Sequence, residues 1–135
     1  MAIIAGDFTE ITYNHPTLGT GTFFPKAAED STLDTGGFRN NDDASGIDGA
    51  GRAIMQKNRV RWSFETTCAM DQNTENDLQK LSDLAESATE ADWTFSHVSG
   101  TIWQAKGSPV GDVQGNANAG TFALKVSGGG KMKKQ

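Results

Sequence analysis

Apolar and polar side chains alternate along most of the chain, which is typical of strands that bury one face. The clearest run covers residues 59–70, where the even positions carry Val60, Trp62, Phe64, Thr66, Cys68 and Met70. Shorter runs with the same period cover 91–97, 101–106 and 121–127. The pattern predicts a mainly β protein, with a hairpin at the turn Ser99-Gly100.

One segment has helical spacing instead. Leucines recur at positions 78, 81 and 84, and Thr74 with Asp77 resembles a capping box whose N-cap is Thr74. We therefore expect a single amphipathic helix over about 75–87. One helix among many strands predicts a small β-barrel or sandwich, with the helix at an end or over a face.

The side chains in phase on these elements form the predicted core, and 135 residues suffice for one domain, 1–135. The predicted core residues are Val60, Trp62, Phe64, Cys68, Leu78, Leu81, Leu84, Trp93, Phe95, Phe122, Leu124 and Val126.

Two segments do not fit a compact core. Residues 26–51 are rich in Gly, Asp and Asn with few large apolar side chains, and we expect an extended loop there that is disordered or held by another subunit. Residues 128–135, which include three glycines and three lysines, are expected to be a flexible tail.

Charge and composition exclude several classes of protein. The chain has 17 acidic against 12 basic residues and a net charge of −5, so nonspecific adhesion to nucleic acid is not expected. One cysteine allows neither an intrachain disulfide nor a cysteine-based zinc site. No apolar run is long enough for a membrane span, and the N-terminus lacks a signal-peptide pattern, so we expect an intracellular protein without membrane contact.

Candidate chemistry is sparse. His15 precedes a proline in a turn, His97 shares a strand face with Trp93 and Phe95, and Cys68 is in phase with the core. The acidic stretch from Asn40 fails the EF-hand template, and the Gly-Gly-Gly-Lys of the tail lacks the rest of a phosphate loop. We predict no enzyme activity, no catalytic residues, no metal and no cofactor.

The order of elements then resembles a known family. The strand Asn58-Arg-Val-Arg-Trp-Ser-Phe-Glu65 is followed by Asp71-Gln-Asn73 and the helix, then by Glu90-Ala-Asp-Trp-Thr94, Gly107-Ser-Pro-Val-Gly-Asp-Val-Gln114 and a last strand ending in Gly-Gly-Gly-Lys131. Together they resemble the short, single-domain tail tube proteins of tailed bacteriophages, related in fold to the inner-tube proteins of type VI secretion and bacteriocins.

The resemblance implies a structural subunit that forms hexameric rings, which stack into a hollow conduit for genome ejection. Its partners would be further copies of itself and the sheath, tape-measure, tail-terminator and baseplate proteins, with DNA as a transient, non-adhesive cargo. It would reside in the virion tail, after assembly in the host cytoplasm.

The same resemblance gives site residues, because residues 26–51 match the loop that reaches neighbouring subunits or rings. The candidates there are Leu33, Asp34, Phe38, Arg39, Asn40, Asp42, Asp43 and Ile47. On the polar side of the long strand, Arg59, Arg61 and Glu65 are candidates for the lumen or for contacts between subunits, and each arginine is expected to pair with Glu65 or a neighbouring acid.

Two alternatives remain open. The first is an inner-tube protein of a contractile bacteriocin or secretion device, which capsid and portal genes nearby would argue against. The second, of another class, is a small ligand-binding β-sandwich that stacks sugars on Trp62, Trp93 and Trp103.

Overall fold

The computed structural model describes residues 2–74 and 76–135, and these form a mainly β structure with one short helix. The predicted fold class is therefore confirmed. The main sheet is antiparallel and runs in the order β2-β1-β9-β10-β12-β8-β3. Its strands are β1 (Phe8–His15), β2 (Gly19–Phe23), β3 (Thr32–Asp34), β8 (Trp62–Ala69), β9 (Ala91–His97), β10 (Ile102–Pro109) and β12 (Thr121–Gly128), with β11 (Gly115–Asn116) on β12 and β13 (Lys133–Lys134) on β10.

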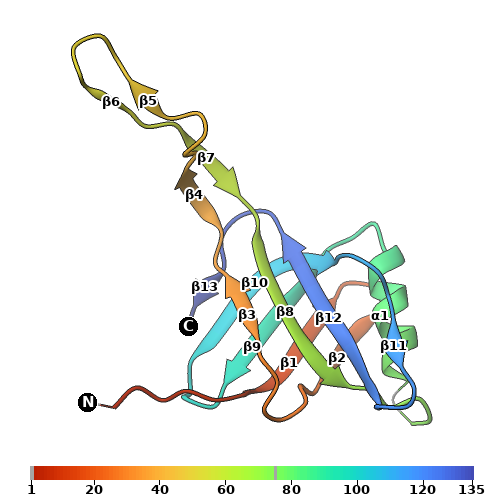
Figure 1. Cartoon of the computed structure of the whole chain (residues 1–135). Coiled ribbons are helices and arrows are strands. Elements are labelled where there is room, and N and C mark those ends of the chain that lie inside the picture. Colours follow the sequence, from red (N-terminus) through yellow and green to blue (C-terminus); the bar gives the residue numbers. More distant parts are fainter. Residues whose placement is uncertain (1, 75) are drawn as a thin grey trace.

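The sheet curls round on itself. Directly after β2, Pro25 bridges to Cys68 on β8, and the Lys26 amide donates to the Thr67 carbonyl at 2.9 Å. The far side is held more loosely, since β10 and β12 pair only at Ser108–Ser127 and Pro109–Val126. The result is a small barrel, drawn in Figure 1 with α1 (Asp77–Glu86) beside one end.

Aromatic side chains fill the barrel. Phe64 and Phe95 stack with ring centroids 4.2 Å apart, and Trp62 and Trp93 are fully buried. Both indoles donate to the backbone of β10, Trp62 to the Lys106 carbonyl and Trp93 to the Gly107 carbonyl, each at 3.0 Å. These bonds satisfy the only polar atom of each buried indole.

Most residues of the predicted core are buried. Two of them are not, which corrects the prediction for Val60 and Leu78. Val60 is 37% exposed, because strand pairing with β8 begins only at Trp62 and Val60 belongs to a separate ladder. Leu78 is only half-buried, while Leu81 and Leu84 carry the apolar face of α1. Beyond the predicted core set, the structure also buries Phe8, Ile11, Tyr13, Phe23, Ala91 and Met132.

The start of the helix also differs from the prediction. Its N-cap is Asn76 in the left-handed conformation, with no side-chain cap, so Thr74 does not cap it; position 75 lies outside the described residues. Asp77 is buried and turns back to accept a hydrogen bond from the Asp71 amide at 3.0 Å. Asp77 therefore anchors the preceding turn instead of completing a capping box.

The segment 26–51 is not an element-free loop. It contains β3, β4 (Gly37–Asn40) and β5 (Gly46–Ile47), and the last two pair with β7 (Lys57–Val60) and β6 (Ala53–Ile54). Periodicity missed β4 and β5 because both of their faces are largely exposed. The two ladders form a ribbon, residues 37–60, which we call the arm; Figure 1 shows it projecting away from the barrel.

The C-terminal segment is not free either. Met132 is buried, its amide donates to the Thr35 carbonyl at 2.8 Å, and Lys131 bridges to Gly36. β13 then adds to β10 through Trp103–Lys134 and Gln104–Lys133. A flexible tail over 128–135 was therefore the wrong expectation.

Candidate assembly surfaces

The arm is built as two short ladders with a bend between them. β4 pairs with β7 from Gly37–Val60 to Asn40–Lys57, and β5 pairs with β6 at Gly46–Ile54 and Ile47–Ala53. In the bend, the Asn41 carbonyl accepts from the Ala44 and Ser45 amides. The backbone of the arm is thereby largely satisfied within the arm itself.

Asp48 holds the turn at the arm's tip. Its Oδ1 accepts from the Ala50 and Arg52 amides, each at 2.9 Å, and its Oδ2 accepts from Arg52 Nε at 2.7 Å. The hydrogen bonds from Arg52, the backbone one above all, lower the pKa of the Asp48 carboxyl. A charged Asp48 therefore fixes this turn at neutral pH.

Large apolar side chains are exposed on the arm. Phe38 is 63% exposed and Ile47 is 74% exposed, and the other exposed ones are Ile54, Met55 and Val60. An isolated two-stranded hairpin is marginally stable in water. A ribbon that exposes such side chains on both faces is typical of a contact surface for another chain.

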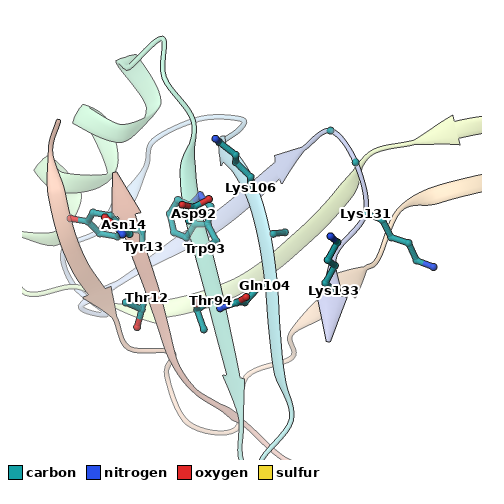
Figure 2. Close-up of a pocket in the computed structure, with 13 residues that line it drawn as sticks. Thr12, Tyr13, Asn14, Asp92, Trp93, Thr94, Gln104, Lys106, Lys131 and Lys133 are labelled. Atoms are coloured by element: carbon teal, nitrogen blue, oxygen red, sulfur yellow. The ribbon is translucent and has the colours of Figure 1, made fainter. Parts of the chain in front are cut away.

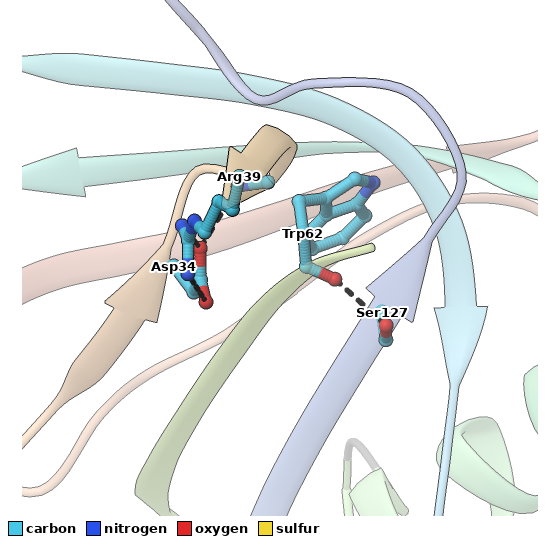
Figure 3. A network of polar contacts seen from close by, with 5 residues as sticks. Asp34, Arg39, Trp62 and Ser127 are labelled. Carbon is cyan, nitrogen blue, oxygen red and sulfur yellow. Dashed lines mark hydrogen bonds and ion pairs between the residues drawn. The ribbon is translucent and has the colours of Figure 1, made fainter. Parts of the chain in front are cut away.

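The base of the arm is fastened to the barrel. Asp34 at the end of β3 binds the Arg39 guanidinium through two contacts, one of them 2.8 Å from Nη1 to Oδ2, and accepts from the Gly36 amide at 2.9 Å. The hydrogen bond from Arg39 lowers the pKa of the Asp34 carboxyl. Beside this pair, the Ser127 hydroxyl donates to the Trp62 carbonyl at 2.7 Å (Figure 3). The direction in which the arm leaves the barrel is therefore fixed by side chains of both.

A basic groove lies at the same base. It encloses about 720 Å³ and is lined by Phe38 and Val60 together with Arg59, Arg61 and Lys131. The Arg59 guanidinium lies 5.1 Å from the centre of the Phe38 ring, a cation–π contact. Within the described part of the chain, neither Arg59 nor Arg61 has an ion pair, so the predicted pairing with Glu65 does not form.

Glu65 lies elsewhere, on the outer face of β8, where it sits between Lys125 of β12 and Thr32 of β3 in the sheet register. The structure therefore separates the three strand-face candidates: Arg59 lies on the arm, Arg61 lies beside it, and Glu65 lies on the barrel.

The loop candidates fall into two groups as well. Leu33 packs against the core and Asp34 anchors the arm, whereas Phe38, Arg39, Asn40, Asp42, Asp43 and Ile47 belong to the arm.

A continuous polar surface covers the outside of β1, β9 and β10, and sequence reasoning did not single it out. Thr12, Thr94 and Gln104 form one row across the three strands, and Asn14, Asp92 and Lys106 form the next. Figure 2 shows this surface with Lys131 and Lys133 at its margin, along a shallow groove of about 610 Å³. The alternation that buries Tyr13, Trp93 and Phe95 could have predicted it, because their strand neighbours must point outward.

The thiol of Cys68 lies inside the barrel. Cys68 is fully buried, which raises the pKa of its thiol to about 12. Three or more His, Cys, Asp and Glu side chains nowhere gather in a way that could hold a metal ion within 2–74 and 76–135. Of the described segments, none forms a helix of the length and apolarity that a membrane crossing needs.

The tryptophans do not form a sugar platform. Trp62 and Trp93 have no exposed surface, and Trp103 is half-buried between β9 and β13 in the register of the sheet. Stacking on a sugar requires an exposed ring face. The structure therefore contradicts the ligand-binding alternative at Trp62 and Trp93, two of the three tryptophans on which it was built.

The fold defines a small antiparallel β-barrel with one helix and a projecting arm. No protein-family model matches the chain, and no curated protein is similar to it. Among solved structures, the chain is similar to one described as the cryo-EM structure of the anti-feeding prophage baseplate, 6-fold symmetrised, with a TM-score of 0.47 and 14% identity over 100% of this chain and 97% of that chain. A TM-score below 0.5 marks a partial likeness, so the function proposed next rests on this chain's own surfaces.

Proposed function

We propose that the protein is a structural subunit of a tail tube of the phage type, in which rings of subunits, expected to be hexameric, stack into a hollow conduit. The observation that carries the proposal is the arm, a ribbon fastened to the barrel whose large apolar side chains are exposed. Such a surface becomes stable when it packs on a neighbouring subunit.

The strand edges support the same proposal. In the part of the chain that the structure describes, β2 pairs only with β1 and β3 only with β8. Open edges favour pairing with another chain, and a closed ring uses them up. Sheets joined in this way around a ring would give a continuous inner wall.

We further propose that the outer face of β1, β9 and β10 lines the conduit. Threonine, asparagine and glutamine dominate its central rows, where the charges of Asp92 and Lys106 offset each other across neighbouring strands, and Lys131 and Lys133 add positive charge only at the margin. Central rows without net charge give phosphates little to bind, so DNA could pass along them without adhering.

Electron microscopy of the purified protein tests this function. We expect negative-stain images to show rings or hollow tubes at moderate concentration. A variant in which residues 38–59 are replaced by Asn-Gly should stay folded and monomeric, because Gly37 and Val60 are register partners and a tight turn can join them. A wild-type protein that remains monomeric at high concentration would contradict the proposal.

An inner-tube subunit of a contractile bacteriocin or secretion device would use the same surfaces. The two settings differ in the genes that accompany the tube. Capsid and portal genes beside this one would assign it to a phage tail, and their absence beside sheath and baseplate genes would assign it to the other kind of device.

A further inference from the structure

We infer that the bend of the arm, residues 41–45, docks through Asp42 and Asp43 into the basic groove at the base of the arm on a second copy of this chain. The inference rests on the proposed self-assembly and names the two surfaces that would meet. It follows from which charges of the arm are paired within the chain and which are not.

The acids of the arm region fall into two groups. Asp34 is bound to Arg39 and Asp48 is bound to Arg52, so both carboxylates are used inside the chain. Asp42 and Asp43 are exposed, adjacent, and without an ion pair among the described residues. The bend is therefore a site of two unneutralised negative charges on a part of the arm that stands clear of the barrel (Figure 1).

The bases of the groove are complementary to this pair. Arg59, Arg61 and Lys131 gather around one concavity in a protein whose net charge is −5. Phe38 and Val60 give the groove an apolar floor, and Phe38 is 63% exposed. Carboxylates that enter beside arginine in a partly desolvated groove form stronger contacts than pairs in open water.

Within one chain, Val60 lines both the groove and a smaller cavity beside the bend, but neither Asp42 nor Asp43 forms an ion pair with a base of the groove among the described residues. Phe38 and Arg59 face each other in the β4–β7 ladder, and Asp42 lies four residues beyond Phe38, or about 13 Å along an extended strand. Because the described part of the chain leaves these carboxylates and bases unpaired with each other, we place the contact between different copies. A contact between unlike surfaces repeats head to tail and closes a ring or extends a stack, which suits a tube.

The N-terminal and C-terminal segments of the chain fit the groove less well than the bend does. The only acid of the N-terminal segment, Asp7, already accepts a hydrogen bond from the Ala28 amide at 3.0 Å. The C-terminal segment is basic and is held on β10. A phosphate group is an anionic occupant from outside the chain, and the experiment separates it from the bend.

Paired charge reversals test the inference on the full-length protein. One variant carries Asp42→Lys and Asp43→Lys, and the other carries Arg59→Glu and Arg61→Glu. We expect each alone to need about tenfold more protein to assemble, or not to assemble at all, by sedimentation velocity and negative-stain microscopy. An equimolar mixture should assemble again, because the reversed bend of one variant complements the reversed groove of the other, while the native bend and groove still match.

The control is Glu90→Lys with Asp112→Lys, which makes the same change in charge as the bend variant, at two exposed positions outside both surfaces. It should assemble like the wild type. Reversal variants that assemble normally, or a mixture that stays dispersed, would overturn the inference. An assembling Asp42→Lys/Asp43→Lys variant whose groove binds inorganic phosphate would also overturn it and assign the groove to a phosphate group.

Failure of the two proposals can be told apart. Wild-type tubes that are insensitive to the reversals would leave the tube function standing and reject this contact. Salt-sensitive wild-type oligomers that are lost on reversal, but never form rings, would support the contact and reject the tube.

Discussion

At the scale of single residues, burial decides what Cys68 and His15 can do. Cys68 has no exposed surface in the barrel. His15 is also buried: its Nδ1 accepts from the Thr17 and Leu18 amides at 3.1 and 3.0 Å, and its Nε2 contacts the Thr89 carbonyl at 3.1 Å. Neither residue is placed for chemistry, and both join segments that are distant in sequence.

Cys68 gives a prediction for alkaline pH. Its pKa is about 12 in the folded protein against 9.0 for a free thiol. Below pH 9 both states keep the proton; between pH 9 and 12 only the unfolded chain loses it, so this thiol makes the free energy of unfolding fall by about 1.4 kcal/mol per pH unit. Urea unfolding at pH 8.5 and 10 should show a smaller fall for Cys68→Ala than for the wild type, and equal falls would contradict the assignment.

His15 gives a prediction for stability. His15→Ala removes the acceptor of two backbone amides and the contact with the segment after α1. We expect a loss of about 1–3 kcal/mol in chemical denaturation. Asn14→Ala, at the exposed neighbouring position, should change stability by less than about 0.5 kcal/mol. Similar losses in both variants would show that the His15 contacts do not stabilise the β1–β2 turn.

At the scale of elements, the join between arm and barrel depends on a glycine. Gly36 has φ 72°, and a Cβ there would lie 2.7 Å from the Trp62 amide nitrogen and 2.9 Å from the Val60 carbonyl oxygen. The arm strands can leave β3 and enter β8 side by side because position 36 carries no side chain. The direction of the arm is thus set by backbone packing as well as by the Asp34–Arg39 ion pair.

Two alanine substitutions separate packing from backbone strain at this join. Gly130 has φ 75° and nothing within 4 Å of a built Cβ, so Gly130→Ala measures the left-handed penalty alone, about 1–2 kcal/mol. Gly36→Ala should cost about 1–3 kcal/mol more, because rigid backbone atoms crowd the added methyl group. Thermal or urea unfolding measures both, and equal costs would mean that the close approach at Gly36 is absent in solution.

At the scale of the whole molecule, each outer face of the barrel can meet either water or another subunit after assembly. The outer face of β1, β9 and β10 is polar throughout its central rows, whereas the opposite outer face carries Glu65 and Lys125 as register neighbours. If the first face lines a water-filled conduit, it should admit small reagents and exclude large ones after assembly. An interface would exclude both kinds.

Labelling of single cysteines tests this arrangement, because the native Cys68 is buried and unreactive. Gln104→Cys, on the proposed lumen face, should react in assembled tubes with a small maleimide but not with a large polyethylene-glycol maleimide. The control variant is Ala123→Cys, which is exposed on the other face of the barrel. In the unassembled protein, both variants should react with both reagents. Protection of Gln104→Cys from both reagents would make this face an interface between subunits.

The sequence by itself determined the barrel. Strands with one face on the core alternate strictly, so Trp62, Phe64, Trp93, Phe95, Phe122 and Leu124 could be placed inside from their phase, and Leu81 and Leu84 from helical spacing. The arm had no such signal, because β4 to β7 expose both faces and carry no alternation that a core would impose. The same absence made residues 26–51 resemble a loop.

Only the tertiary structure decided the candidate surfaces. Arg59 and Arg61 share a strand phase with Glu65, yet the break at position 61 assigns Arg59 to the arm and Glu65 to the barrel. Lys131 lines the basic groove because burial of Met132 and the pairing of β13 with β10 hold the C-terminal segment against the barrel. Local patterning records which side of a strand is buried; which residues from distant segments share a surface depends on where the strands pair and where they separate.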